Sequence, residues 1–415
     1  MTKLLLLFTV ALVFSVSCSN TNRNSGQVKE TKTTRKGMST FEYDSSFLAR
    51  YTQPVFLSSG KASLAVSPEY QGRVMTSTAD GSGGLSFGWV NYDLIASGRI
   101  LEKINPVGGE DRLWLGPEGG QYSLFFPAGS EFVFENWKTP AVFDSKPFTL
   151  LESNDTSALF RESFQVSNYA GTVFDMRIDR RVTILDSKNI KKEYGISPVD
   201  DLSLVGYKSV NQITNTGSQA WKRETGLVSI WILGMYVPSP STVIFAPYKN
   251  GPDDKDKPEL KTSYFGTIPP ENLKVTTDFV FFKADGKYRS KIGIPPAREG
   301  SYIAAYDPDN HILTVVRHNR PPEGSVYVNS LWKMQEHPYG GDVVNAYNDG
   351  PLEDNSQLGP FYELETSSPG AELAPMESLV HIEQTVHFTG DEAALDKIAV
   401  KSLGISLGVV KNALK

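Results

Sequence analysis

The chain of 415 residues is poor in several features that would restrict its fold or its partners. It has a single cysteine, Cys18, which excludes a disulfide framework and a thiolate metal cluster. It has no block of five like charges and no basic stripe, and its net charge is -6, so nucleic acid is not expected as a partner. The chain does contain 40% hydrophobic residues, enough for a large core, together with 35 glycines and 25 prolines. That glycine and proline content argues against a helical bundle and favours many short strands and turns.

The first 17 residues have the pattern of a secretory signal peptide rather than of a fold element. The apolar run from Leu4 to Val16 would form a helix of about 13 residues and about 20 Å, too short for a bilayer core of about 30 Å. Ser17 stands directly before Cys18, an ending that resembles the bacterial lipobox, in which the cysteine becomes the lipidated first residue of the mature protein. A plain signal peptide with an incidental cysteine is the alternative. Residues 18–38 are then the lipidated cysteine and a polar tether that is expected to be disordered.

From residue 39 onward the sequence shows strands and turns. Between Val173 and Ile184, apolar and polar residues alternate with the two-residue period of a half-buried strand. Residues 150–159 and 302–316 each place a polar turn between apolar flanks, which predicts hairpins. Further strands are predicted at 243–245, 278–282 and 379–388.

One short helix is predicted near the C-terminus, where Asp391 can cap its start, Leu395 and Ile398 follow at helical spacing, and Gly404 can end it. No linker divides residues 39–415, and no repeat of about 40 to 50 residues indicates a propeller. The predicted fold class is therefore all-β: one large antiparallel sandwich of two broad sheets over 39–415, with one short C-terminal helix. Two smaller sandwiches in tandem are the alternative.

The segment Gly108–Gly120 places acids, an arginine and a tryptophan between glycine pairs. Arg112 and Trp114 lie two residues apart and so share one face of an extended chain. A guanidinium beside an indole suits a sugar, because hydroxyls need rigid donors and the C–H face of a pyranose stacks on an aromatic ring. Arg112, Trp114 and Glu118 are therefore candidate substrate-binding residues. The alternative is that Arg112 pairs with Asp111 or Glu118 and that Trp114 packs in the core.

Two glutamates alternate with apolar residues near the C-terminus. On a strand, Glu363 and Glu365 point the same way, while Tyr362 and Leu364 face the core. Two carboxylates on one strand face, roughly 7 Å apart, repel each other, which suits one of them to act as a base near neutral pH. An ordinary solvated strand face is the alternative.

All five histidines lie in the last quarter of the chain. About 20 Å of strand separates His381 from His387, too far for one metal ion, and surface or rim positions are expected for both. His337 lies in the stretch Trp332–Asp342, whose acids, aromatics and glycines are typical of a functional loop. Trp332 and His337 are thus further candidate site residues, with ordinary loop hydrogen bonding as the alternative for His337.

The order of several short segments along the chain is also informative. These segments are Gly72–Met75, Gly108–Glu118, Asn215–Gly217 and Glu363–Thr366, the last of which is followed by Leu373–Pro375. In this order they resemble the galactose mutarotase-like (aldose 1-epimerase-like) superfamily, and more closely its Bacteroidetes-type lipoprotein branch. The resemblance spans most of the mature chain. It implies a β-supersandwich that binds carbohydrate in an open cleft on one sheet.

The resemblance implies roles for single residues as well. In mutarotases a glutamate takes the proton from the anomeric hydroxyl while a histidine protonates the ring oxygen. Glu365, between Leu364 and Thr366, matches the base, and Arg112 matches the arginine that holds the substrate. The family's acid histidines come earlier in the chain, whereas this chain has no histidine before position 311. The acid is therefore expected to be missing or to be replaced by His337 or Glu363.

Three functions remain open on these grounds. The first is a lipid-anchored protein of the bacterial cell envelope, on the periplasmic face or the cell surface, that binds carbohydrate in the cleft with degenerate catalysis. An aldose 1-epimerase-like or glycan-processing enzyme with Glu365 as base is the second, and a non-catalytic envelope scaffold is the third. The expected partners are carbohydrate and, through the lipid on Cys18, a membrane. No cofactor is expected, although four acids without EF-hand spacing could ligate Ca²⁺: Asp111, Glu118, Asp342 and Asp349.

Overall fold

The computed structural model describes residues 37–197, 201–249, 259–320 and 322–415. The signal peptide predicted at 1–17, the lipidation site predicted at Cys18 and nearly all of the predicted tether lie outside the described residues. Within these ranges, no helix has the length and apolar character needed to cross a membrane.

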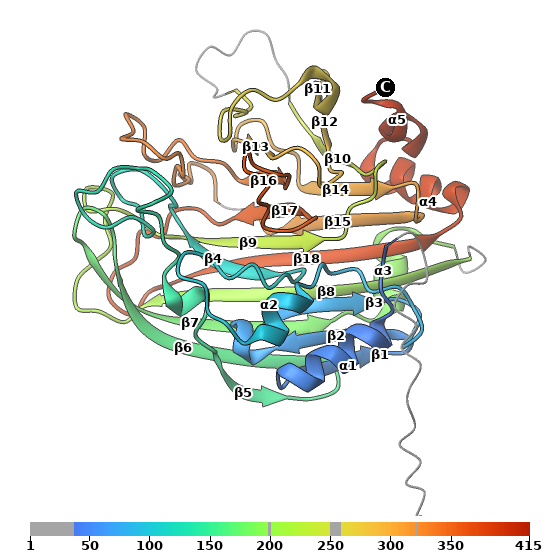
Figure 1. Ribbon diagram of the computed structural model, residues 1–415, viewed down its shortest axis with the longest axis horizontal. Helices are drawn as coiled ribbons and strands as arrows, with labels where there is room; N and C mark the ends of the chain where they lie inside the picture. The colour runs from blue at the N-terminus through green and yellow to red at the C-terminus, as the bar shows by residue number, and fades with distance from the viewer. Residues whose placement is uncertain (1–36, 198–200, 250–258, 321) are drawn as a thin grey trace, which may run out of the picture. The chain divides into compact units, whose positions relative to one another are not determined.

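In the described part of the chain, the strands form three antiparallel sheets (Figure 1). The largest has ten strands in the order β11-β12-β10-β14-β15-β18-β8-β7-β6-β5. These strands are β5 (Thr149–Ser153), β6 (Ser157–Ser167), β7 (Val173–Ile184), β8 (Leu202–Asn215), β10 (Val243–Pro247), β11 (Leu273–Val275), β12 (Phe279–Lys283), β14 (Tyr302–Asp307), β15 (Ile312–His318) and β18 (Ser378–Gly390).

The second sheet has five strands in the order β13-β16-β17-β9-β4 and forms the floor of the candidate site. Its strands are β4 (Arg112–Gly116), β9 (Ser229–Tyr236), β13 (Ser290–Ile294), β16 (Val344–Asn348) and β17 (Tyr362–Ser367). A small third sheet contains β1 (Val55–Ser59), β2 (Ala62–Ser67) and β3 (Arg73–Thr78).

Short helices precede, connect and follow the strands of the described chain. They are α1 (Phe41–Tyr51), α2 (Tyr92–Ser97), α3 (Ser187–Glu193), α4 (Glu392–Ile398) and α5 (Leu407–Asn412), with single helical turns at Pro68–Tyr70, Ala141–Phe143, Pro270–Asn272 and Ala399–Leu403. The helix predicted near the C-terminus is confirmed, because Asp391 caps α4 through the backbone N–H of Ala394 and Gly404 ends the following turn at a positive φ. The prediction of a single helix was wrong, since α1, capped by Thr40, and three others accompany it.

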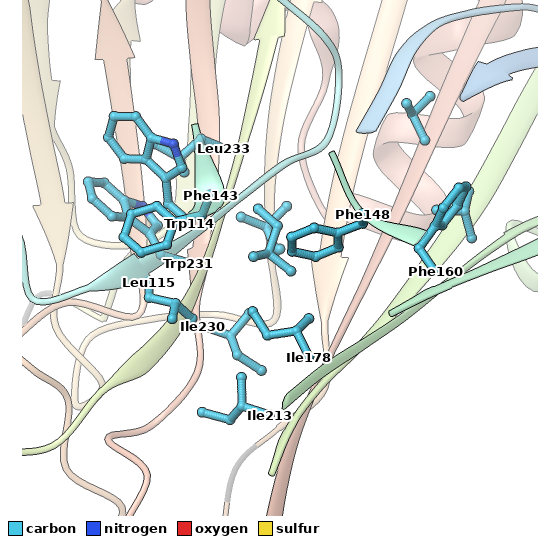
Figure 2. Packing of buried hydrophobic residues seen from close by; sticks show 14 of the residues in the cluster. Trp114, Leu115, Phe143, Phe148, Phe160, Ile178, Ile213, Ile230, Trp231 and Leu233 are labelled. Atoms are coloured by element: carbon cyan, nitrogen blue, oxygen red, sulfur yellow. The ribbon is translucent and has the colours of Figure 1, made fainter. Parts of the chain in front are cut away.

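The ten-stranded and five-stranded sheets share their apolar cores. Ile178 and Ile213 of the large sheet meet Ile230 of β9 in one cluster, which Figure 2 shows beside Trp114 and Trp231. Farther along, residues of β10, β14 and β15 pack with residues of β13, β16 and β17 in a second cluster. A third cluster covers part of the large sheet with α3, α4 and α5. Burying these apolar faces between layers is what stabilises the two sheets against each other.

The alternation of residues along the five-stranded sheet decides which side chains reach the site. In β17, Tyr362 and Leu364 enter the core, so Glu363 and Glu365 point to the opposite face, as the sequence predicts. In β4, Leu113 packs into the core, and the residues on either side of it in the sequence, Arg112 and Trp114, line the cleft. The same period in β9 and β13 brings further side chains to that outer face: Trp231, Leu233, Met235 and Lys291.

The predicted all-β class with antiparallel sheets is confirmed. The alternating segment coincides with β7, Val173–Ile184, and both predicted hairpins are present as β5–β6 and β14–β15. The expected surface or rim positions of His381 and His387 were wrong. Their strand β18 is central in the large sheet and is covered on both faces, so both side chains are buried and hydrogen-bonded, His381 to Thr366 and His387 to Glu110.

Candidate functional site

A cleft opens over the outer face of the five-stranded sheet, with a volume of about 1010 Å³ including its mouth. Its floor is formed by β4, β9, β13, β16 and β17, and loops supply the walls. Four of the chain's six tryptophans line it, from two strands and two loops: Trp114, Trp137, Trp231 and Trp332. Three cationic and three acidic side chains share the same space: Arg112, Arg289, Lys291, Glu118, Asp349 and Glu363.

Arg112 and Glu363 form an ion pair on the floor of the cleft. Arg112 Nη2 donates to Glu363 Oε1 at 2.8 Å, and the guanidinium lies 4.1 Å from the centre of a Trp114 ring. Arg112 is 2% exposed, and its Nε and Nη1 have no hydrogen-bond partner in the described chain. Burial raises the pKa of Glu363 above its ordinary value, while Arg112 acts to lower it. The alternative in which Arg112 pairs with Asp111 or Glu118 was wrong. Its second part is confirmed, because Trp114 is 3% exposed and packs in the core cluster while it also borders the cleft.

Glu365 lies beneath the cleft rather than in its wall. Its carboxylate accepts hydrogen bonds from Lys291 Nζ at 2.8 and 3.0 Å and from Trp231 Nε1 at 2.8 Å, and the side chain is fully buried. Lys291 and Trp231 line the cleft, whereas Glu365 is not among its lining residues. This geometry favours a role for Glu365 in holding Lys291 and Trp231 in place.

Glu118 and Trp332 stand where loops meet the cleft. Burial raises the pKa of Glu118 to about 7, and the nearby charge of Glu365 adds to the shift, whereas Lys291 opposes it. A carboxyl group with this pKa can hold or release a proton near neutral pH. The Trp332 ring stacks on Trp137 at 5.9 Å and packs edge-on against Phe126, which keeps its face fixed at the entrance.

Arg289, which also lines the cleft, belongs to a chain of polar contacts. Its Nε donates to the hydroxyl of Tyr347 at 3.2 Å, and Tyr347 donates to Asp349 Oδ1 at 2.5 Å. Asp349 Oδ2 accepts from the backbone N–H of Gly359 at 3.0 Å. Burial raises the pKa of Asp349, while these hydrogen bonds act to lower it.

The structure does not bring His337 to the cleft. Its side chain is exposed on the loop, its carbonyl oxygen accepts from Asn329 Nδ2, and it is absent from the lining residues. No histidine lines the cleft in the described ranges. The role of His337 as an acid therefore stays a prediction without support from this geometry.

The four acids considered for Ca²⁺ lie in different surroundings. Asp111 pairs with Arg180, and Asp342 with Lys261, while Glu118 and Asp349 line the cleft. Across the residues that the structure describes, no group of three or more histidine, cysteine or acidic side chains is placed to hold a metal ion.

Sequence reasoning missed several residues that complete the cleft. Arg289 and Lys291 are two residues apart and flank the start of β13, so they reach the same face. Trp231 of β9 lies between the core residues Ile230 and Ile232 and also lines the cleft. A search for charged residues two apart would have found Arg289 and Lys291 but not Trp231, which has Ser229 and Leu233 at those positions.

The family to which the chain belongs follows from comparison of its sequence with family models. One model, described as a family of unknown function (DUF6786), matches residues 39–414. The chain belongs to this family. No curated protein matches the chain in sequence.

Solved structures similar to this family member have low sequence identity to it. A galactose mutarotase-like protein from Lactobacillus casei is 8% identical, with 81% of this chain and 99% of that chain covered and a TM-score of 0.46. A galactose mutarotase related enzyme from Lactobacillus acidophilus is 7% identical, with 81% and 97% covered and a TM-score of 0.43. A TPR-domain containing protein from Parabacteroides distasonis is 13% identical, with 81% and 47% covered and a TM-score of 0.44.

Proposed function

We propose that this protein binds carbohydrate in the cleft over the five-stranded sheet. The observation that carries the proposal is the meeting of four tryptophans with buried ion pairs in one cleft. Indole faces bind the C–H faces of a pyranose, and charged groups provide strong hydrogen bonds to its hydroxyls. An apolar cleft with a few convergent polar groups is also the usual form of a small-ligand site.

The Arg112–Glu363 pair supplies the polar part of this site. Among the residues that the structure describes, Arg112 Nε and Nη1 have no hydrogen-bond partner, although an unpartnered buried donor is costly. Small movements of the pair would let a sugar hydroxyl accept from Arg112 and donate to Glu363. The contact of Arg112 with the Trp114 ring holds the guanidinium against the aromatic floor of the cleft.

A thermal-shift screen of the purified protein against monosaccharides and oligosaccharides tests this proposal. A ligand at 100 times its dissociation constant adds about 2.7 kcal/mol of stability, which raises Tm by a few degrees in a domain of this size. We expect at least one saccharide to give this shift and Glu363→Gln to abolish it. The matched control is Glu152→Gln, which changes an exposed glutamate of β5 and should leave the shift intact. If no saccharide raises Tm, the proposal is contradicted, and a non-catalytic envelope scaffold becomes the favoured function.

A second candidate function is an isomerase or glycan-active enzyme that uses two carboxyl groups of the cleft. Glu118 and Glu363 both line the cleft, and burial raises both pKa values, that of Glu118 to about 7. One protonated and one ionised carboxyl group could serve as acid and base at an anomeric centre. Anomer exchange of a bound sugar, followed by NMR, should then be faster with the wild type than with Glu118→Gln. If anomer exchange with the wild type proceeds only at the uncatalysed rate, the protein binds the sugar without catalysing its isomerisation.

The proposal also includes a lipid anchor at Cys18 and a place in the bacterial cell envelope. Its support is the sequence of residues 1–38, in which an apolar run and Ser17 precede the cysteine. In a bacterial host, the wild type should sediment with membranes and Cys18→Ser should not. Equal membrane association of the two proteins would contradict the anchor without affecting the cleft.

A further inference from the structure

The charges in the cleft are not paired evenly. Arg112 has Glu363 at 2.8 Å, and Lys291 has Glu365 at 2.8 Å. Arg289, the third cation, has no carboxylate within ion-pair distance among the described residues. Its charge acts on the cleft acids Glu118 and Asp349 only at longer range, lowering the pKa of each, so in the described chain it lacks a direct partner.

Arg289 is nevertheless held in a defined orientation. Its Nε donates to Tyr347, which is itself anchored on Asp349, and its guanidinium lies 4.3 Å from the centre of the Phe265 ring. The side chain is only partly exposed, and within the described chain its two Nη groups make no hydrogen bond. Fixing a long side chain costs conformational entropy, and here that ordering leaves the hydrogen-bonding end of the guanidinium free.

The place of Arg289 in the cleft gives a ligand access to it. Arg289 lines both the main cleft and an adjoining hollow, which share the walls formed by Phe265, Trp332 and Leu352. A substituent on a sugar ring stacked in the main cleft can therefore reach this side chain. The guanidinium is planar, always charged and weakly hydrated, which matches carboxylate and sulfate oxygens better than neutral hydroxyls.

We propose that Arg289 recognises an anionic substituent, a carboxylate or a sulfate, so that the ligands of this cleft are acidic saccharides. The inference rests on the proposed carbohydrate binding and narrows it to a ligand class. Arg289 acts as a specificity-determining residue, while the tryptophans and the Arg112–Glu363 pair hold the sugar ring itself.

Calorimetric titration of the purified protein with matched saccharides tests the inference. One arm compares glucuronic and galacturonic acid, and their oligosaccharides, with glucose, galactose and the neutral oligosaccharides. A second arm uses sulfated forms of the same neutral sugars, and a third uses succinate, which carries carboxylates without a sugar ring. We expect the acidic members of the first or second arm to bind at least tenfold more tightly than their neutral counterparts. Which arm shows the preference identifies the anionic group.

Two substitutions separate direct contact from a general effect of charge. Arg289→Gln should remove the preference for acidic sugars and leave the affinity for neutral ones within about twofold. Lys287→Gln removes a positive charge from an exposed position two residues away and should keep the preference. With the wild type alone, added salt should weaken binding of the acidic sugars and leave the neutral ones unchanged.

Each outcome bears on one claim. Equal binding of acidic and neutral sugars, or a preference that survives Arg289→Gln, would overturn the role of Arg289 and leave carbohydrate binding intact. Binding of succinate as tight as that of the uronic acids would overturn the saccharide part. Failure of every saccharide to bind would overturn the proposed function together with this inference.

Discussion

Two adjacent residues, Asp111 and Arg112, lead to two very different ion pairs. Asp111 turns inward and accepts from Arg180, both side chains being fully buried, and Arg180 makes three further hydrogen bonds, to Gly72, Asn211 and the carbonyl of Asp111. Arg112 turns outward into the cleft, where, within the described ranges, it makes one hydrogen bond, to Glu363, and leaves Nε and Nη1 without partners. The interior arginine is thus fully satisfied, and the cleft arginine is not.

This difference separates a structural charge from a candidate binding charge. A buried ion pair stabilises a fold only when further hydrogen bonds satisfy its remaining donors and acceptors. Each side-chain nitrogen of Arg180 has a partner and ties β7 to the segment before β4 and to β8, although Asp111 Oδ2 accepts no hydrogen bond within the described chain. Arg112 leaves two of its three nitrogens without a partner there, so its spare donors are explained best by a ligand that supplies acceptors.

The largest effect on stability is expected when the interior ion pair, Asp111–Arg180, is broken. Asp111→Ala leaves Arg180 charged and buried without its carboxylate, which should lower the free energy of unfolding by roughly 3–5 kcal/mol. The matched control is Asp179→Ala, which breaks the partly exposed pairs with Arg161 and Arg177 and should cost no more than about 1 kcal/mol. Urea unfolding of both variants measures the difference. Equal losses in the two variants would contradict the structural role of Asp111.

A smaller effect is expected at the entrance of the cleft, and on binding rather than on stability. Trp332→Ala removes a half-buried stacking face, so affinity for the saccharide found in the screen should fall roughly tenfold. Phe56→Ala changes an exposed aromatic residue of β1, outside the cleft, and should leave affinity unchanged. Titration of both variants checks the prediction, which fails if the two affinities are the same.

The smallest effect is expected in the pH dependence of stability. The folded pKa of Glu118 is about 7, above the ordinary value of 4.5, so the folded state binds more protons than the unfolded state between these pH values. Stability contributed by this group is therefore full below pH 4.5 and is lost as pH rises through 7. Glu118→Gln should raise the free energy of unfolding at pH 8 by roughly 1 kcal/mol, after allowance for solvent screening, and should leave it unchanged at pH 4. Equal differences at pH 4 and pH 8 would contradict this.

Local patterns in the sequence predict much of the fold. The bounds of β7 follow from strict alternation, and the Asp391 cap and Gly404 stop define α4 and the turn after it. Helix α1 (Phe41–Tyr51) was missed because its stability depends on packing Phe41 and Leu48 against β3 and α2. Propensity alone does not reveal such a helix.

The sequence predicts which side chains share one face of the sheet, but it does not predict which of them form ion pairs. Alternation placed Arg112 with Trp114 and Glu363 with Glu365, and all four reach the outer side of one sheet. The partner of Arg112 is 251 residues away in the chain and that of Asp111 is 69 away. A single sequence contains no signal for such contacts, because they depend on the strand order. The depth of Glu365 below the cleft has the same origin, since it depends on Lys291 and Trp231 from two other strands.

A crystal structure of the protein with the saccharide that gives the largest thermal shift would test the central claim most directly. The account predicts a sugar ring stacked on a tryptophan of the cleft, with a sugar oxygen within hydrogen-bond distance of Arg112 or Glu363 and the Asp111–Arg180 pair unchanged. A saccharide bound elsewhere on the protein, with the cleft unoccupied, would contradict it.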